Sequence, residues 1–161
     1  MAIDAARFRQ ITGHFATGVT VITTAHEGWL HGMTANAVAS VSLNPLLLLV
    51  CVDKTANMHQ QIAKAGRFGV NILTDEQEDI SRTFAETTEP EQNALQGVAY
   101  RMGEHGSPII DDALAHMECE VAEAFEGGDH MIYLASVVSG ELDEEGAPLL
   151  FYRGGYRRLE R

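Results

Sequence analysis

The sequence predicts one mostly β domain with a few short helices, in which the strands form a largely antiparallel barrel. The chain has 161 residues, of which 45% are apolar and 21% are charged, a balance typical of a domain with a packed core. About six short runs rich in apolar and β-branched residues are separated by glycine and polar residues, which favours an all-β arrangement. No internal repeat, low-complexity tract or linker divides the chain, so we expect a single domain over residues 1–161.

The N-terminal part predicts a helix followed by a β-hairpin. Asp4 is a suitable N-cap for the helix. Three apolar side chains fall on one face of that helix: Phe8, Ile11 and Phe15. Residues 17–24 are rich in β-branched side chains and predict a strand, and a turn at residues 25–28 leads to a second strand that begins at Trp29.

Residues 46–52 form an unbroken apolar run that predicts a buried strand. Thr55 is expected to cap a helix that ends at Gly66, and residues 68–73 predict a further short strand.

The next segment predicts a helix and then an irregular region. Asp75 and Glu78 have the spacing of a capping box. Ile80 and Phe84 are four residues apart, so they share one face of the helix that follows. The polar segment 86–105 is expected to be a loop or a lid.

The C-terminal third predicts two long strands and a short final element. The strands cover residues 117–125 and 131–138, and residues 127–130 connect them. Residues 149–153 then precede a Gly-Gly break and a basic tail.

Composition limits the classes of function. The formal net charge is −12, which argues against nucleic acid or an anionic membrane as the partner, since both need a basic face. The sequence has no segment of signal-peptide type and no apolar run of the roughly 20 residues that span a bilayer, so we expect a cytoplasmic protein. Cys51 and Cys119 are outside any CxxC pair, which favours free thiols, and no HxH or HExxH spacing indicates a metal site.

Residues 32–54 carry the strongest indication of a binding site. Small and polar residues precede the apolar strand, and small side chains let a flat ligand approach the backbone. Lys54, one of only two lysines, stands where a helix begins, and a cation beside a helix N-terminus suits a phosphate group. One segment can therefore hold both ends of a planar, phosphorylated cofactor.

Six segments, taken in order, resemble the short-chain flavin reductase family: FATGVTVITT, GMTANAVASVSLNP, CVDK, RFGVNIL, GGDH and FYRGGYR. The similarity extends over residues 8–157. It implies an FMN-binding split β-barrel of Greek-key type that forms a homodimer. It also implies an oxidoreductase that uses NADH or NADPH to reduce FMN or FAD and supplies reduced flavin to a partner flavin-dependent monooxygenase.

The resemblance also implies roles for particular residues. The isoalloxazine is bordered by Thr34, Ala35, Asn36, Ala37 and Val38, with Ser40 in the same segment, and the ribityl phosphate is held by Cys51, Val52, Asp53, Lys54 and Thr55. His130 faces the nicotinamide, and the segment from Tyr152 to Tyr156 lies nearby. The family usually has serine where this chain has Ala37, so one hydroxyl near the flavin is missing, at a cost of about 0.5–1.5 kcal/mol of binding.

Each residue also has an ordinary structural interpretation. Lys54 and Thr55 can be a surface lysine and a helix cap, Asn36 can mark a bulge or turn, and His130 can be a surface histidine. Arg82 either approaches the phosphate or is solvent-exposed, and Phe84 either borders the cofactor or packs in the core.

Two other functions stay open at this level. One is an oxidoreductase that retains its flavin and acts on another substrate. The other is a non-catalytic module that binds flavin or haem, for which His31 and His59 are the nearest candidate axial ligands.

Overall fold

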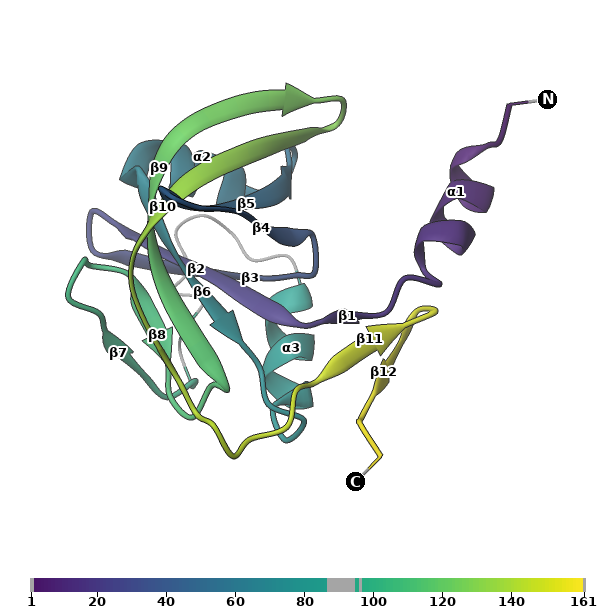
Figure 1. Ribbon diagram of the computed structural model, residues 1–161. Coiled ribbons are helices and arrows are strands. Elements are labelled where there is room, and N and C mark those ends of the chain that lie inside the picture. Colours follow the sequence, from purple (N-terminus) through teal and green to yellow (C-terminus); the bar gives the residue numbers. More distant parts are fainter. Residues whose placement is uncertain (1, 87–94, 96, 161) are drawn as a thin grey trace.

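The computed structural model describes residues 2–86, 95 and 97–160 of the chain. Its main element is a seven-stranded antiparallel sheet in the order β3-β2-β6-β9-β10-β5-β4 (Figure 1). The strands are β2 (Thr20–His26), β3 (Trp29–Ala35), β4 (Val38–Leu43), β5 (Leu46–Asp53), β6 (Arg67–Ile72), β9 (Ala115–Gly127) and β10 (His130–Leu142). The two outer strands, β3 and β4, do not pair with each other, so the hydrogen-bonded ladder does not close into the continuous barrel that the sequence predicted.

Two smaller sheets accompany the main one. The first joins β1 (Thr17–Gly18), β11 (Leu150–Tyr152) and β12 (Gly155–Arg157), so that it brings together residues from both ends of the chain. The second is the pair β7 (Tyr100–Met102) and β8 (Pro108–Ile110).

Three helices lie in the described residues: α1 (Ala5–Thr12), α2 (Asn57–Ala65) and α3 (Glu78–Ala85). Met58 and Ile62 of α2 pack on strands of the main sheet in a first core cluster, with Phe68, Val50 and Tyr133 among its members. Phe84 of α3 belongs to a second cluster that includes Val21 and Leu73. The two helices therefore cover separate parts of the core.

Helix α1 stands apart from the main sheet and is joined to it through β1 (Figure 1). It begins as predicted, because Oδ1 of Asp4 accepts a hydrogen bond from the backbone N–H of Arg7 at 2.7 Å. The apolar face predicted for this helix is solvent-exposed: Phe8 is 57% exposed and Phe15 is 79% exposed. This face therefore has no partner within the described part of the chain.

Most predicted elements are confirmed with small changes in their ends. The hairpin β2–β3 turns at Glu27 and Gly28, whose φ angles of 49° and 84° are those of a tight hairpin turn. Gly66 ends α2 in the left-handed conformation, with φ of 69°, and its N–H donates to the carbonyl oxygen of Ile62. Both cysteines are free thiols.

Two predicted helix caps are wrong. Thr55 does not cap α2; its N–H and hydroxyl both donate to Oδ1 of Asp53, at 2.8 and 2.7 Å, and the N-cap is Ala56. The capping box at Asp75 and Glu78 does not form either, because α3 begins only at Glu78, with Gln77 as its N-cap. Helix α2 and helix α3 both start without a hydrogen bond from the side chain of the N-cap residue.

The predicted loop over residues 86–105 is only partly correct. Residues 100–102 form β7, which pairs with β8. Residues 87–94 and 96 lie outside the described residues. No helix in the described residues is long and apolar enough to cross a membrane.

Candidate functional site

Two adjoining cavities form a groove between the end of β3, helix α3 and the hairpin β11–β12. The larger cavity has a volume of about 430 Å³ and is lined by Thr34, Ala35, Asn36, Ser81, Arg82 and Tyr156, among others. The smaller cavity, of about 200 Å³, lies between β3, the start of α2 and the end of α3. Its lining residues include Gly32 and Thr34 of β3, Ala56 and Asn57 at the start of α2, and Phe84 of α3. Thr34 and Ala85 line both cavities, so we describe them as one groove.

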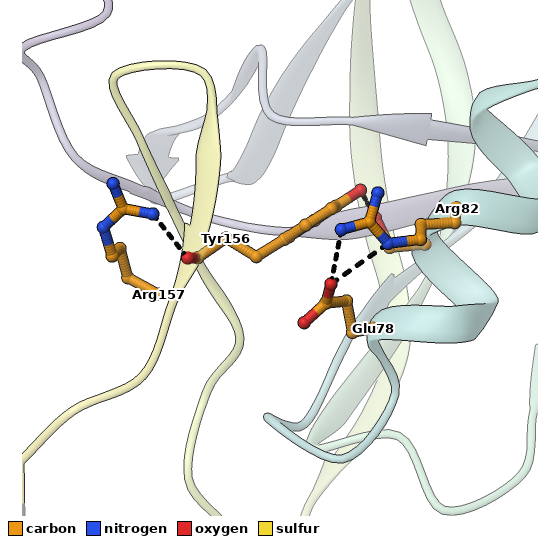
Figure 2. A network of polar contacts seen from close by, with 5 residues as sticks. Glu78, Arg82, Tyr156 and Arg157 are labelled. Carbon is orange, nitrogen blue, oxygen red and sulfur yellow. Dashed lines mark hydrogen bonds and ion pairs between the residues drawn. The ribbon is translucent and has the colours of Figure 1, made fainter.

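Tyr156 closes one side of the groove through contacts with α3 (Figure 2). Its hydroxyl lies 2.7 Å from Oγ of the fully buried Ser81. The guanidinium of Arg82 lies over its ring, 4.8 Å from the centroid, an arrangement that favours a cation–π contact. These contacts hold the C-terminal hairpin against the helix.

The guanidinium of Arg82 is oriented by its own helix. Nη2 and Nε donate to Oε1 of Glu78 at 2.6 and 3.0 Å, and these hydrogen bonds raise the pKa of Arg82. Arg157 points away from this contact and donates to the carbonyl oxygen of Tyr156 at 2.7 Å (Figure 2). Arg82 is therefore the arginine that the structure places at the groove.

The floor of the groove depends on close packing between β3 and α3. The hydroxyl of Thr34 donates to the carbonyl oxygen of Ser81 at 2.6 Å. Gly32 has room only for hydrogen, because a Cβ there would lie 2.5 Å from Cε1 of Phe84. Phe84 is 3% exposed and belongs to the second core cluster, so its main contacts are packing contacts, although one edge lines the smaller cavity.

The segment between β3 and β4 borders the groove with backbone and an exposed amide. Asn36 and Ala37 are exposed, and the carbonyl oxygen of Ala37 accepts a hydrogen bond from the N–H of Cys51 at 3.0 Å. The side chain of Asn36 has no hydrogen-bond partner among the described residues, so its donor and acceptor remain available to a ligand. Val38 and Ser40 lie further along β4, where they pair with β5.

A second group of predicted residues lies where β5 ends beside β10. His130 is the ladder partner of Asp53, and its Nδ1 lies 2.7 Å from Oδ1 of Asp129. The hydrogen bonds from the backbone and hydroxyl of Thr55 hold the pKa of Asp53 below its usual range. Nζ of Lys54 pairs with Oε1 of Glu126 at 3.3 Å.

The start of α2 connects this second group with the groove. Ala56, immediately after Thr55, lines the smaller cavity, and no N-cap side chain occupies the helix end there. Val52 is fully buried and the thiol pKa of Cys51 is raised by burial, so the backbone is what these two residues offer. Tyr152 contacts His14 edge-on at 6.1 Å, apart from the ring of Tyr156.

The structure also adds a residue that the sequence did not indicate. Ser81 helps to shape the groove, and it escaped notice because serine is common in any sequence. Gly32, the first residue of the segment that the sequence did indicate, contributes through its close contact with Phe84. Of the two histidines considered for haem, His59 is engaged, because its Nδ1 lies 2.5 Å from the hydroxyl of Tyr133. His31 is 4% exposed and lines the smaller cavity, and its Nε2 has no hydrogen-bond partner among the described residues. Among the described residues, no group of three or more His, Cys, Asp or Glu is placed to hold a metal ion.

The structure is therefore a mostly β protein with a groove between its main sheet, helix α3 and the C-terminal hairpin. A family model described as the flavin reductase like domain matches residues 12–160, and the chain belongs to that family.

Individual relatives are similar along almost their full length. The reductase subunit HsaB of a flavin-dependent monooxygenase from Mycobacterium tuberculosis (strain H37Rv) is 43% identical over 162 residues, which cover 98% of this chain and 84% of the relative. The solved structure of the flavin reductase PheA2 matches with a TM-score of 0.89 at 41% identity, covering 99% of this chain and 100% of that one. The NADH:FAD oxidoreductase SgcE6 of Streptomyces globisporus C-1027, in complex with NAD and FAD fragments, matches with a TM-score of 0.92 at 39% identity, covering 98% and 93%.

Proposed function

We propose that this protein is an NAD(P)H:flavin oxidoreductase that reduces FMN or FAD and supplies the reduced flavin to a partner monooxygenase. The observation that carries the proposal is the groove at residues 34–36, which combines an unpaired amide with the phosphate-compatible start of α2. The names of the relatives support it, since they describe the reductase subunit of a monooxygenase and an NADH:FAD oxidoreductase.

The residues of the groove fit a flavin. Asn36 offers both a donor and an acceptor, which matches the alternating N–H and C=O groups on the edge of a flavin ring. The start of α2 lacks a side-chain cap, and Lys54 precedes its first residue, Asn57, by three positions, so this junction suits a phosphate. Arg82 adds a second cation at the larger cavity.

In this proposal the chain binds and orients, and the bound flavin accepts hydride from the nicotinamide. Hydride transfer needs the two rings in contact rather than a protein acid or base. His130 would act as a positioning residue for the nicotinamide, and its contact with Asp129 fixes the ring. Ala37 leaves the flavin edge to backbone groups, because it lacks the hydroxyl of the usual serine.

We further propose that the chain is one domain over residues 1–161, that the main sheet is the core of a Greek-key split barrel, and that two copies form a homodimer. The exposed apolar face of α1 supports the dimer, since a surface with Phe8 and Phe15 exposed favours burial against another molecule. The two free cysteines are consistent with the cytoplasm as the location. Sedimentation analysis tests the dimer: a monomer at micromolar concentration would contradict it.

The function is tested by anaerobic reduction of added flavin. The purified protein is mixed with FMN or FAD and with NADH or NADPH, and bleaching of the flavin is followed by absorbance. Saturable, flavin-dependent oxidation of one nucleotide is expected, together with loss of flavin on dialysis. Retention of flavin through dialysis favours an oxidoreductase that acts on another substrate, and no oxidation with any pair overturns the proposal.

A further inference from the structure

A second, larger cavity lies outside the groove, between α1 and the turn of the hairpin β11–β12. Its volume is about 630 Å³, which is in the range of about 300–1,000 Å³ typical of small-molecule sites. Three arginines line it, Arg7 and Arg9 from α1 and Arg153 from the hairpin turn, together with His14. We name it the basic cavity.

The charge of this cavity is opposite to that of the molecule. The chain has 23 acidic residues and only 11 Lys and Arg, yet three of those 11 line the basic cavity and none of its lining residues is acidic. Within the described residues, none of the three guanidiniums forms an ion pair. Like charges gathered without a counter-charge repel one another, so the cavity favours an anionic ligand.

The hairpin turn is fixed to the end of α1 by backbone contacts. The N–H of Arg153 donates to the carbonyl oxygen of Gly13 at 2.8 Å. Arg153 and Gly154 have φ angles of 50° and 76°, the values of a tight two-residue hairpin turn, so the geometry of this turn fixes the backbone from which the Arg153 side chain extends. His14 is held from both sides, because Nδ1 lies 2.7 Å from the carbonyl oxygen of Gln10 and the ring contacts Tyr152.

The basic cavity adjoins the groove. Gly154 lines both the basic cavity and the larger cavity of the groove. A ligand with an aromatic end in the groove and a charged middle can therefore reach the arginines across this residue.

We propose that the basic cavity binds the diphosphate portion of the nicotinamide dinucleotide, whose nicotinamide ring meets the flavin in the groove. Arginine suits this role because its planar guanidinium donates paired hydrogen bonds to phosphate oxygens. The inference rests on the proposed function, in which NAD(P)H carries a diphosphate joined to adenosine. FAD carries the same group, but the phosphate next to its flavin is assigned to the start of α2. The shared chemistry is the adenosine diphosphate group, and kinetics distinguish its two sources.

Direct binding of ADP tests the site without any reaction. ADP is titrated into the protein by isothermal calorimetry, with the double variant R7Q/R153N and the control R158Q, whose arginine lies in the tail and does not line the cavity. Asparagine replaces Arg153 because it tolerates a positive φ. We expect ADP affinity to fall about tenfold or more in the double variant, because two charge-assisted contacts are lost. In the wild type, ADP affinity should fall with added salt, because salt screens the attraction between the arginines and the phosphates. An equal affinity in the double variant and the control, or no binding of ADP to the wild type, overturns the proposal.

Steady-state kinetics then identify the source of the diphosphate. FMN lacks the adenosine diphosphate group, so a raised KM for NADH with FMN as acceptor assigns the cavity to the nicotinamide dinucleotide. A raised KM for FAD, with the constants for FMN and NADH unchanged, assigns it to FAD and overturns the proposal. If no KM changes, the proposal is wrong; if ADP binds as expected but no flavin is reduced, the anion site stands and the proposed function fails.

Discussion

Replacement of Gly32 by alanine tests the packing that forms the floor of the groove. An added Cβ would lie 2.5 Å from Cε1 and 2.6 Å from Cδ1 of Phe84, distances at which one of the groups must move. Phe84 is 3% exposed and packed in the second core cluster, so it has little room to yield. Overpacking of this kind costs about 1–3 kcal/mol.

The free energy of unfolding of G32A should therefore fall by that amount. With a urea dependence of about 2 kcal/mol/M, a loss of 2 kcal/mol lowers the midpoint of unfolding by about 1 M. Unfolding followed by circular dichroism measures the change. Flavin affinity should weaken in parallel, because Phe84 and Gly32 both line the smaller cavity.

Two further variants separate the clash from a general effect of alanine. Gly18, which has no atom within 4 Å of the position of an added Cβ, is the matched control, and G18A should be as stable as the wild type or slightly more stable. In the double variant G32A/F84L the smaller side chain relieves the clash, so the two costs should not add. A stable G32A, or strict additivity with F84L, would refute the assigned contact.

Three more predictions concern the site and the stability of the protein. K54A should raise the dissociation constant for flavin by about tenfold through loss of a charge-assisted contact. The control E126Q, which removes the ion-pair partner of Lys54, should not weaken flavin binding. An unchanged dissociation constant in K54A contradicts the phosphate role. H130A should raise the KM for NAD(P)H more than the dissociation constant for flavin, and the opposite pattern in steady-state kinetics and flavin titrations would mean that His130 is misassigned. Burial raises the pKa of Glu118, but hydrogen bonds to its carboxylate lower the pKa overall; the donors are the N–H groups of Ser107 and His105 and the hydroxyl of Ser139. The ionised carboxylate therefore stabilises the fold at neutral pH, and this stabilisation is lost as the pH falls through the lowered pKa. E118Q should therefore cost about 1–3 kcal/mol at pH 7 and less in acid, and urea unfolding that shows the same difference at both pH values would contradict this reasoning.

Local signals in the sequence predicted much of the secondary structure. The cap at Asp4, the hairpin before Trp29 and the end of α2 at Gly66 each depend on residues within a few positions of one another, and all three are confirmed. The resemblance of six segments predicted the family correctly.

The wrong predictions arose where another group competed for the same hydrogen bond. The carboxylate of Asp53 accepts both the N–H and the hydroxyl of Thr55, so Thr55 has no hydroxyl left for α2. The N–H of Asp75 donates to the carbonyl oxygen of Ala147, far along the chain, and α3 starts later than the capping-box spacing implied. Contacts of this kind depend on the folded structure and leave no pattern in the local sequence.

The groove likewise depends on contacts between distant segments, which local sequence patterns do not predict. Thr34, Ser81 and Tyr156 meet through hydrogen bonds between three distant segments, and no spacing in the sequence indicates that they do. The sequence indicated Asn36 and Tyr156 separately, as parts of two motifs, but the wall that they share with α3 depends on how the small sheet of β1, β11 and β12 packs.

The division of the groove between two sheets has a consequence for how the protein exchanges ligand. Thr34 and Ala35 belong to the seven-stranded sheet, whereas Phe151 and Tyr156 belong to the small sheet that β1 joins to the N-terminal segment. A bound molecule would contact both sheets and stabilise their packing. When it dissociates, the first and last segments of the chain should become more mobile together. Protease sensitivity near both termini should then report occupancy, while hydrogen exchange in β6 and β9 stays slow throughout.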